Sequence, residues 1–101
     1  MSEIVHIVMW RLNGASADTK NRQAADIVEA FEQTRASIPG LLRMEVGRNI
    51  HNGADDWDIA LYMAFESRHH LECYQSNPAH LAIKKLVGPM RLSRGQVDFQ
   101  L

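Results

Sequence analysis

The chain is poor in cysteine, since Cys73 is the only one among its 101 residues. A single cysteine excludes an intrachain disulfide, so a reducing cytoplasm is the expected location. The sequence also lacks any apolar run close to the roughly 20 residues that a membrane-spanning helix needs. Its first residues, Met1 to Glu3, contain neither a basic segment nor a small-residue cleavage site. We therefore expect no signal peptide.

An excess of charge of either sign is also missing. Lys and Arg number 11, Asp and Glu number 12, and the formal net charge is -1. Because no basic surplus is present to neutralise a phosphate backbone, a dedicated nucleic-acid binder is disfavoured. The sequence has no Gly-rich phosphate loop, nucleophile elbow or Cys/His cluster. His69-His70 and the acidic segment after His51 match no metal-ligand spacing, and we expect neither a metal nor a cofactor.

Apolar periodicity divides the chain into strand, helix, strand, strand, helix, strand. Ser16 is a plausible N-cap of the first helix, and the second helical region begins at Ser67 and restarts at Asn77-Pro78. The predicted strands span residues 3–12, 41–50, 57–65 and 90–100, and the helices span residues 17–37, 67–74 and 77–88, with a polar turn at 51–56. This βαββαβ order predicts one α+β domain over residues 1–101. Its ferredoxin-like fold is a four-stranded antiparallel sheet with helices on one face.

The first and third strands are apolar on both faces. In the first, Val8 and Trp10 lie on one face and Val5 and Ile7 on the other. Two-sided apolar strands indicate that both faces of the sheet are covered, yet the chain's own helices can cover only one. We therefore expect a homodimer in which the open faces of two sheets meet and close into a barrel.

Three side chains suited to proton transfer stand out. His6 interrupts the apolar first strand, and Tyr74 and His80 flank the Asn77-Pro78 break between the helical segments. Tyr and His exchange protons near neutral pH or bind an oxyanion. His80 lies in the first turn of its helix, where the positive helix end favours neutral imidazole. The alternative for each residue is structural, with the polar atoms bonded to each other or to backbone.

Four arginines on or near strands, Arg43, Arg48, Arg91 and Arg94, are the other notable polar residues. Arg94 and Asp98 fall on one face of the last strand. We expect these arginines to pair with Glu45 or Asp98 within the barrel rather than to bind an anion.

Six segments carry a resemblance that covers nearly the whole chain: Ile4 to Arg11, Ile38 to Leu41, Val46 to Asn49, Phe65 to Ser67, Tyr74 to His80 and Val97 to Phe99. With these segments at these spacings, the chain resembles the stress-responsive A/B barrel (Dabb) domain family of the dimeric α+β barrel superfamily. The resemblance implies a dimeric α+β barrel. In the cyclase branch of that family, a strand-one His, a helix Tyr and the His of a Pro-Ala-His unit line a pocket. They catalyse an aldol-type ring closure without a cofactor, and the matching positions here are His6, Tyr74 and His80.

Our main hypothesis is a homodimeric Dabb protein with a pocket between sheet and helices that binds a small apolar carbonyl or aromatic compound. In a catalytic pocket, His80 would be the base, Tyr74 the oxyanion donor or proton shuttle, and His6 the orienting partner. The activity would be cyclase- or lyase-like. Two alternatives stay open: a non-enzymatic, stress-associated structural barrel and a cofactor-independent monooxygenase of the related barrel type. We expect neither nucleic acid nor membrane as a partner.

Overall fold

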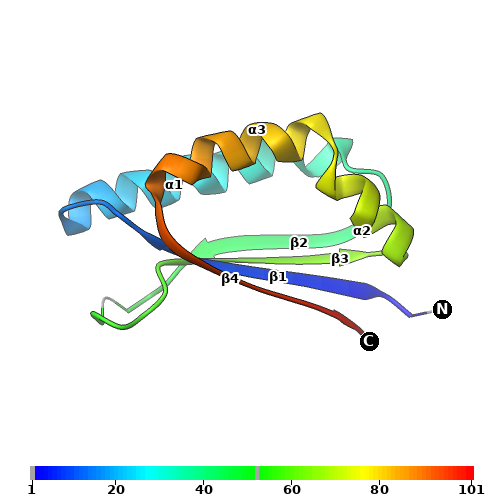
Figure 1. Cartoon of the computed structure of the whole chain (residues 1–101), viewed down its shortest axis with the longest axis horizontal. Coiled ribbons are helices and arrows are strands. Elements are labelled where there is room, and N and C mark those ends of the chain that lie inside the picture. The colour runs from blue at the N-terminus through cyan, green and yellow to red at the C-terminus, as the bar shows by residue number, and fades with distance from the viewer. Residues whose placement is uncertain (1, 52) are drawn as a thin grey trace.

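The structure is a computed structural model that describes residues 2–51 and 53–101 (Figure 1). Asn52, in the predicted polar turn, lies outside the described residues. The elements in chain order are β1 (Ile4–Leu12), α1 (Ala17–Thr34), the 3-10 turn η1 (Arg35–Ser37), β2 (Leu41–Arg48), β3 (Ile59–Phe65), α2 (Arg68–Gln75), α3 (Pro78–Val87), the 3-10 turn η2 (Gly88–Met90) and β4 (Arg91–Gln100). The predicted order of strands and helices is confirmed.

The predicted helix starts are confirmed atom by atom. The Ser16 side chain accepts a hydrogen bond from the backbone N–H of Thr19, and Ser67 does the same for His70. The Asn77 side chain accepts from the N–H of Ala79, at a distance of 2.8 Å. Each cap satisfies a backbone donor that has no partner inside its helix.

The hairpin strands are shorter than predicted. β2 ends at Arg48 rather than at residue 50, and β3 begins at Ile59 rather than at residue 57. Beyond the last strand pair, the backbone N–H of Asn49 donates to the Asp58 carbonyl at 2.9 Å, and the side-chain amide of Asn49 donates to the Trp57 carbonyl at 2.7 Å. The loop thus begins where a side chain, rather than the backbone, supplies the donor.

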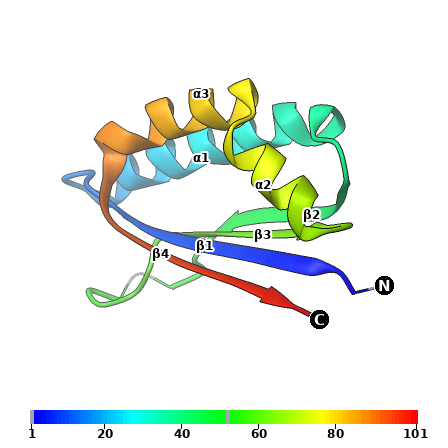
Figure 2. The same cartoon turned by 45° about the vertical axis from the view of Figure 1, so that its right-hand side comes forward.

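The four strands form one sheet in the order β2-β3-β1-β4, and every neighbouring pair is antiparallel. All three helices lie on the same face of this sheet (Figure 2). The fold is therefore the predicted ferredoxin-like α+β arrangement. The core lies between the sheet and the helices, where Trp10, Phe31, Leu61 and Met63 are almost fully buried. Each such side chain contributes roughly 1.5–3 kcal/mol relative to an exposed position.

The opposite face of the sheet is largely apolar and carries no helix. Ile7, at its centre, pairs with Tyr62 of β3 and Val97 of β4. Val97 and Phe99 remain 60% and 41% exposed. None of the helices in the described residues has the length and apolar character needed to cross a membrane.

Candidate functional site

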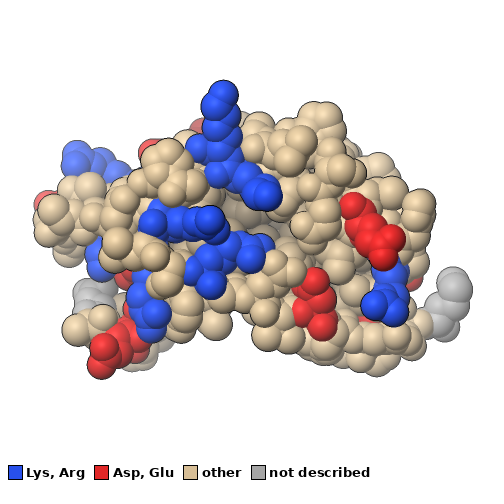
Figure 3. Space-filling view, in the orientation of Figure 1, with Lys and Arg blue, Asp and Glu red and all other residues tan. Residues whose placement is uncertain are grey.

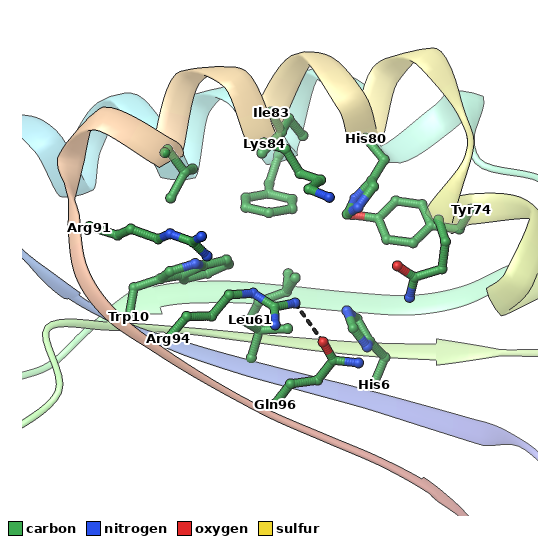
Figure 4. A pocket seen from close by; sticks show the side chains of 15 residues that line it. His6, Trp10, Leu61, Tyr74, His80, Ile83, Lys84, Arg91, Arg94 and Gln96 are labelled. Atoms are coloured by element: carbon green, nitrogen blue, oxygen red, sulfur yellow. Dashed lines mark hydrogen bonds between the residues drawn. The ribbon is translucent and has the colours of Figure 1, made fainter.

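A cavity of about 290 Å³ lies between the helix-facing side of the sheet and the helices α2 and α3 (Figure 4). All three predicted site residues line it. His6 points into it from β1, because the even-numbered residues of that strand face the helices. Tyr74 reaches it from the end of α2 and His80 from the first turn of α3. The break at Asn77-Pro78 lets these two helices bring both rings to one place.

Tyr74 is only 2% exposed, and its hydroxyl has no hydrogen-bond partner. Its ring lies against that of His80, with centroids 4.4 Å apart, and 6.2 Å from that of His6. Burial raises the pKa of Tyr74 from 10 to about 12, with a smaller opposing effect of Arg94. The phenol therefore keeps its proton at neutral pH and can donate it in a hydrogen bond.

His80 is 9% exposed, and its Nδ1 atom also has no hydrogen-bond partner. Burial lowers the pKa of His80 from 6.5 to about 4, and the neighbouring Lys84, His6 and Arg94 lower it further in that order. The ring is therefore neutral at pH 7, as the sequence predicts.

His6 differs from the other two because it has a strong partner. Its Nδ1 atom lies 2.5 Å from Oδ1 of Asp98, the residue directly opposite it on β4. A carboxylate accepts hydrogen bonds, so Nδ1 carries the hydrogen and Nε2 is the ring nitrogen left for a ligand. The predicted pairing of Arg94 with Asp98 is not what the structure contains. Arg94 instead donates to Gln96 Oε1 at 2.6 Å, and Gln96 Nε2 donates to Asp98 Oδ2 at 2.9 Å.

The cavity has an apolar wall and a basic mouth. The wall is made by aromatic and aliphatic side chains from β1, β3, α1 and α3: Val8, Trp10, Leu61, Phe31, Ile83 and Val87. Lys84, Arg91 and Arg94 also line the cavity, whereas no Asp or Glu among the described residues does. Lys and Arg side chains gather around a hollow on this side of the molecule (Figure 3). An apolar wall with a few converging polar groups is typical of a small-molecule site.

The remaining histidines lie outside this cavity. His70 Nδ1 bonds the Ser67 hydroxyl at 2.8 Å, and His69 Nε2 lies 3.5 Å from Cys73 Sγ on the exposed side of α2. Among the described residues, no group of three or more His, Cys, Asp or Glu is placed to hold a metal ion.

Neither Asp98 as the partner of His6 nor the cationic mouth was predicted from the sequence. Part of the signal was visible, because Arg94, Gln96 and Asp98 alternate on one face of β4. Lys84 follows His80 by four residues, which places both on one side of α3. The sequence did not indicate the register of β4 against β1, which places Asp98 opposite His6.

The fold and the cavity together define a ferredoxin-like α+β domain with a ligand-sized pocket between sheet and helices. The family model described as the stress responsive A/B barrel domain (Dabb) matches residues 4–101. The chain belongs to this family.

Solved structures agree with this assignment. A dimeric protein of unknown function with a ferredoxin-like fold from Bacteroides fragilis is 30% identical, with a TM-score of 0.86 over 98% of this chain and 96% of that one. A dimeric ferredoxin-like protein of unknown function from Thermobifida fusca is 26% identical, with a TM-score of 0.86 over 99% and 92%. Hydroxynitrile lyase from Passiflora edulis is 16% identical, with a TM-score of 0.80 over 98% and 93%, and shows the shared fold alone. No curated protein matches the chain in sequence.

Proposed function

We propose that the protein catalyses cofactor-independent proton transfer on a small carbonyl compound bound in the cavity, in a reaction of the lyase, cyclase or isomerase type. One observation carries the proposal: two buried polar atoms without hydrogen-bond partners, Tyr74 Oη and His80 Nδ1, lie beside a His–Asp pair at one cavity. Buried polar groups are nearly always hydrogen-bonded, so unpaired ones at a cavity are suited to a ligand. A hydroxynitrile lyase has this fold, which is compatible with lyase chemistry on it.

The geometry favours His6, rather than the sequence-predicted His80, as the base. The Asp98 carboxylate holds the His6 ring through Nδ1 and stabilises the imidazolium that forms when Nε2 accepts a proton. His80 has a pKa near 4, which makes it a weak base at neutral pH. His6 thus takes the role of base that was predicted for His80, and His80 becomes a hydrogen-bond donor beside Tyr74.

Tyr74 and His80 are then suited to stabilise negative charge. When His6 Nε2 takes a proton from the carbon beside a carbonyl, the C–H electron pair forms a carbon–carbon double bond and the carbonyl oxygen becomes an enolate. The phenol of Tyr74 and a neutral imidazole N–H of His80 would donate to that oxygen. Their proximity, with ring centroids 4.4 Å apart, allows both to act on one atom. The enolate can then be reprotonated or attack a second carbonyl.

Exchange of the α-hydrogens of a ketone for deuterium tests this proposal. Small aryl ketones in D₂O, with chelator-treated protein, should exchange their α-hydrogens at least about 100-fold faster than in buffer, as measured by proton NMR. His6→Gln should abolish the exchange, and Asp98→Asn should lower it by about 10- to 100-fold. His69→Gln, an exposed change on α2, serves as the matched control.

An absence of exchange together with tight ligand binding would overturn the catalytic proposal. That result would favour the non-enzymatic barrel, the first alternative. The monooxygenase alternative predicts oxygen uptake with an aromatic substrate, which an oxygen electrode can follow in the same samples.

The homodimer is also part of this proposal. Relatives of 26–30% identity are described as dimeric, and the helix-free face of this sheet is largely apolar. Two copies meeting through that face would leave the cavity, on the helix side, accessible in each subunit. The cytoplasmic location stays a prediction.

A further inference from the structure

We propose that the pocket selects small carboxylates, with the carboxylate held at the mouth by Lys84, Arg91 and Arg94 and an apolar body lying against Trp10 and Phe31. This proposal concerns the substrate class. It rests on the proposed function only for the reaction at the inner end of the cavity. It reverses the expectation that Arg91 and Arg94 serve internal pairing.

The three cations converge from two consecutive elements, α3 and β4, which are joined by the 3-10 turn η2. Lys84 extends from the last turn of α3, while Arg91 and Arg94 extend from the first half of β4 (Figure 4). All three line the same cavity. Within the described residues, none of them forms an ion pair with a carboxylate, although five other ion pairs are present.

The acidic side chain of β4 is already engaged. Asp98 bonds His6 through Oδ1 and accepts from Gln96 through Oδ2. Asp98 therefore forms no direct ion pair with Lys84, Arg91 or Arg94, although its charge acts on Arg94 from a distance. In a chain of net charge -1, three cations without an acidic residue among them form a local concentration of positive charge. Such a lining attracts anions and raises their local concentration.

The cations also act on each other. Burial and the neighbouring Arg91 lower the pKa of Arg94, against smaller opposing effects of Asp98 and Tyr74, and Lys84 and Arg94 both contribute to the lowered pKa of His80. Like charges held this close disfavour each other. A bound carboxylate would remove that repulsion and accept paired hydrogen bonds from an arginine fork.

The cavity also limits the size of the ligand. At roughly 30 Å³ for each water-sized atom, a volume of about 290 Å³ holds about ten non-hydrogen atoms, with the carboxylate in the mouth beyond them. Lys84 follows His80 by four residues, a rise of about 6 Å along α3. The carboxylate and the reacting carbonyl would therefore be separated by only a few bonds. A 4-oxo-4-arylbutanoate has this size and spacing.

Binding of 4-oxo-4-phenylbutanoate and of its uncharged methyl ester, measured by calorimetry, tests the inference. The acid should bind at least about 10-fold more tightly than the ester, and higher salt should weaken only the acid. Lys84→Gln and Arg94→Gln should each lower the affinity for the acid by about 3- to 10-fold and leave the ester unchanged.

Lys85→Gln is the matched control, since it removes the same charge from the adjacent position of α3 but does not line the cavity. It should leave both affinities unchanged. Equal binding of acid and ester, equal losses in the Lys84 and Lys85 variants, or no binding of either compound up to about 10 mM would overturn the inference.

This measurement separates the inference from the proposed function. Cation-dependent binding of the acid without α-hydrogen exchange would support carboxylate selection and overturn the catalytic proposal. Exchange of α-hydrogens on neutral ketones, without tighter binding of the acid than of the ester, would support the catalytic proposal and overturn carboxylate selection.

Discussion

At the scale of single residues, the cavity is distinguished by polar atoms that the fold leaves unpaired. The Tyr74 hydroxyl and His80 Nδ1 are both buried without hydrogen-bond partners, although their rings are in contact. An unpaired buried polar group costs about 1–3 kcal/mol. A purely structural tyrosine and histidine would bond to each other or to backbone. This arrangement therefore favours a functional role at the expense of stability.

Tyr74→Phe should separate stability from function. The change removes an unpaired hydroxyl and keeps the ring, so the free energy of unfolding should stay unchanged or rise by up to about 1 kcal/mol. Urea denaturation measures this, and the exchange assay should show at least about a 10-fold loss of activity. Tyr62→Phe, on the opposite face of the sheet, is the control and should leave activity unchanged. A loss of stability in the Tyr74 variant would mean that its hydroxyl has a structural partner.

The lowered pKa of His80 predicts how stability depends on pH. The folded protein binds the proton with a pKa of about 4, whereas the ordinary value of 6.5 applies to the unfolded chain. Between pH 6.5 and pH 4 the unfolded chain therefore binds more protons, and the free energy of unfolding falls as pH falls, by up to about 3 kcal/mol. The slope is about half its maximum at pH 6.5 and vanishes about one pH unit higher, where the histidine is neutral in both states.

Denaturation of the wild type and of His80→Gln across this pH range checks the prediction. In His80→Gln, the free energy of unfolding should no longer show this fall between pH 6.5 and pH 4. His69→Gln should retain it. Parallel curves for wild type and His80→Gln would show that His80 titrates normally in the folded protein.

At the scale of elements, strand register separates what could be predicted from what could not. The alternation of the first strand and the Asn77-Pro78 break singled out His6, Tyr74 and His80 from local signals, but only the family resemblance implied that the three meet at one pocket. The His6–Asp98 pair could not be predicted in the same way, because residues 92 positions apart meet only through the register of β4 on β1. A shift of one residue would have turned Asp98 to the other face.

The turn between η1 and β2 depends on Gly40. Its φ angle is +75°, and a Cβ atom there would lie 2.2 Å from Cγ of His70 on α2. Gly40→Ala should therefore lower the free energy of unfolding by at least about 2 kcal/mol, from backbone strain and from displacement of α2.

Thermal or urea denaturation measures this loss. Gly47→Ala is the matched control, since Gly47 lies in β2 without a positive φ and an added Cβ would meet nothing within 4 Å. That variant should be as stable as the wild type or more stable by about 0.4–1 kcal/mol. Equal effects of the two substitutions would contradict the proposed constraint at Gly40.

At the scale of the whole molecule, the two faces of the sheet differ in what covers them. The helix side contains the core and the cavity, while the other side exposes Val97 and Phe99 beside a central Ile7. Val97→Asp should prevent dimerisation, because a lone carboxylate would be buried between the two sheets. Light scattering at about 10 µM should give a dimer for the wild type and a monomer for the variant.

Leu81→Asp is the control, since it also adds a carboxylate at an exposed apolar residue, 49% exposed, but on the helix side. It should remain dimeric. The Val97 variant should still bind the acid probe if it stays folded, because the residues that line the cavity lie on the helix side of the sheet, away from Val97, or on the helices. A dimeric Val97→Asp would place the interface elsewhere. A folded monomer without ligand binding would show instead that the pocket needs the second subunit to hold its shape.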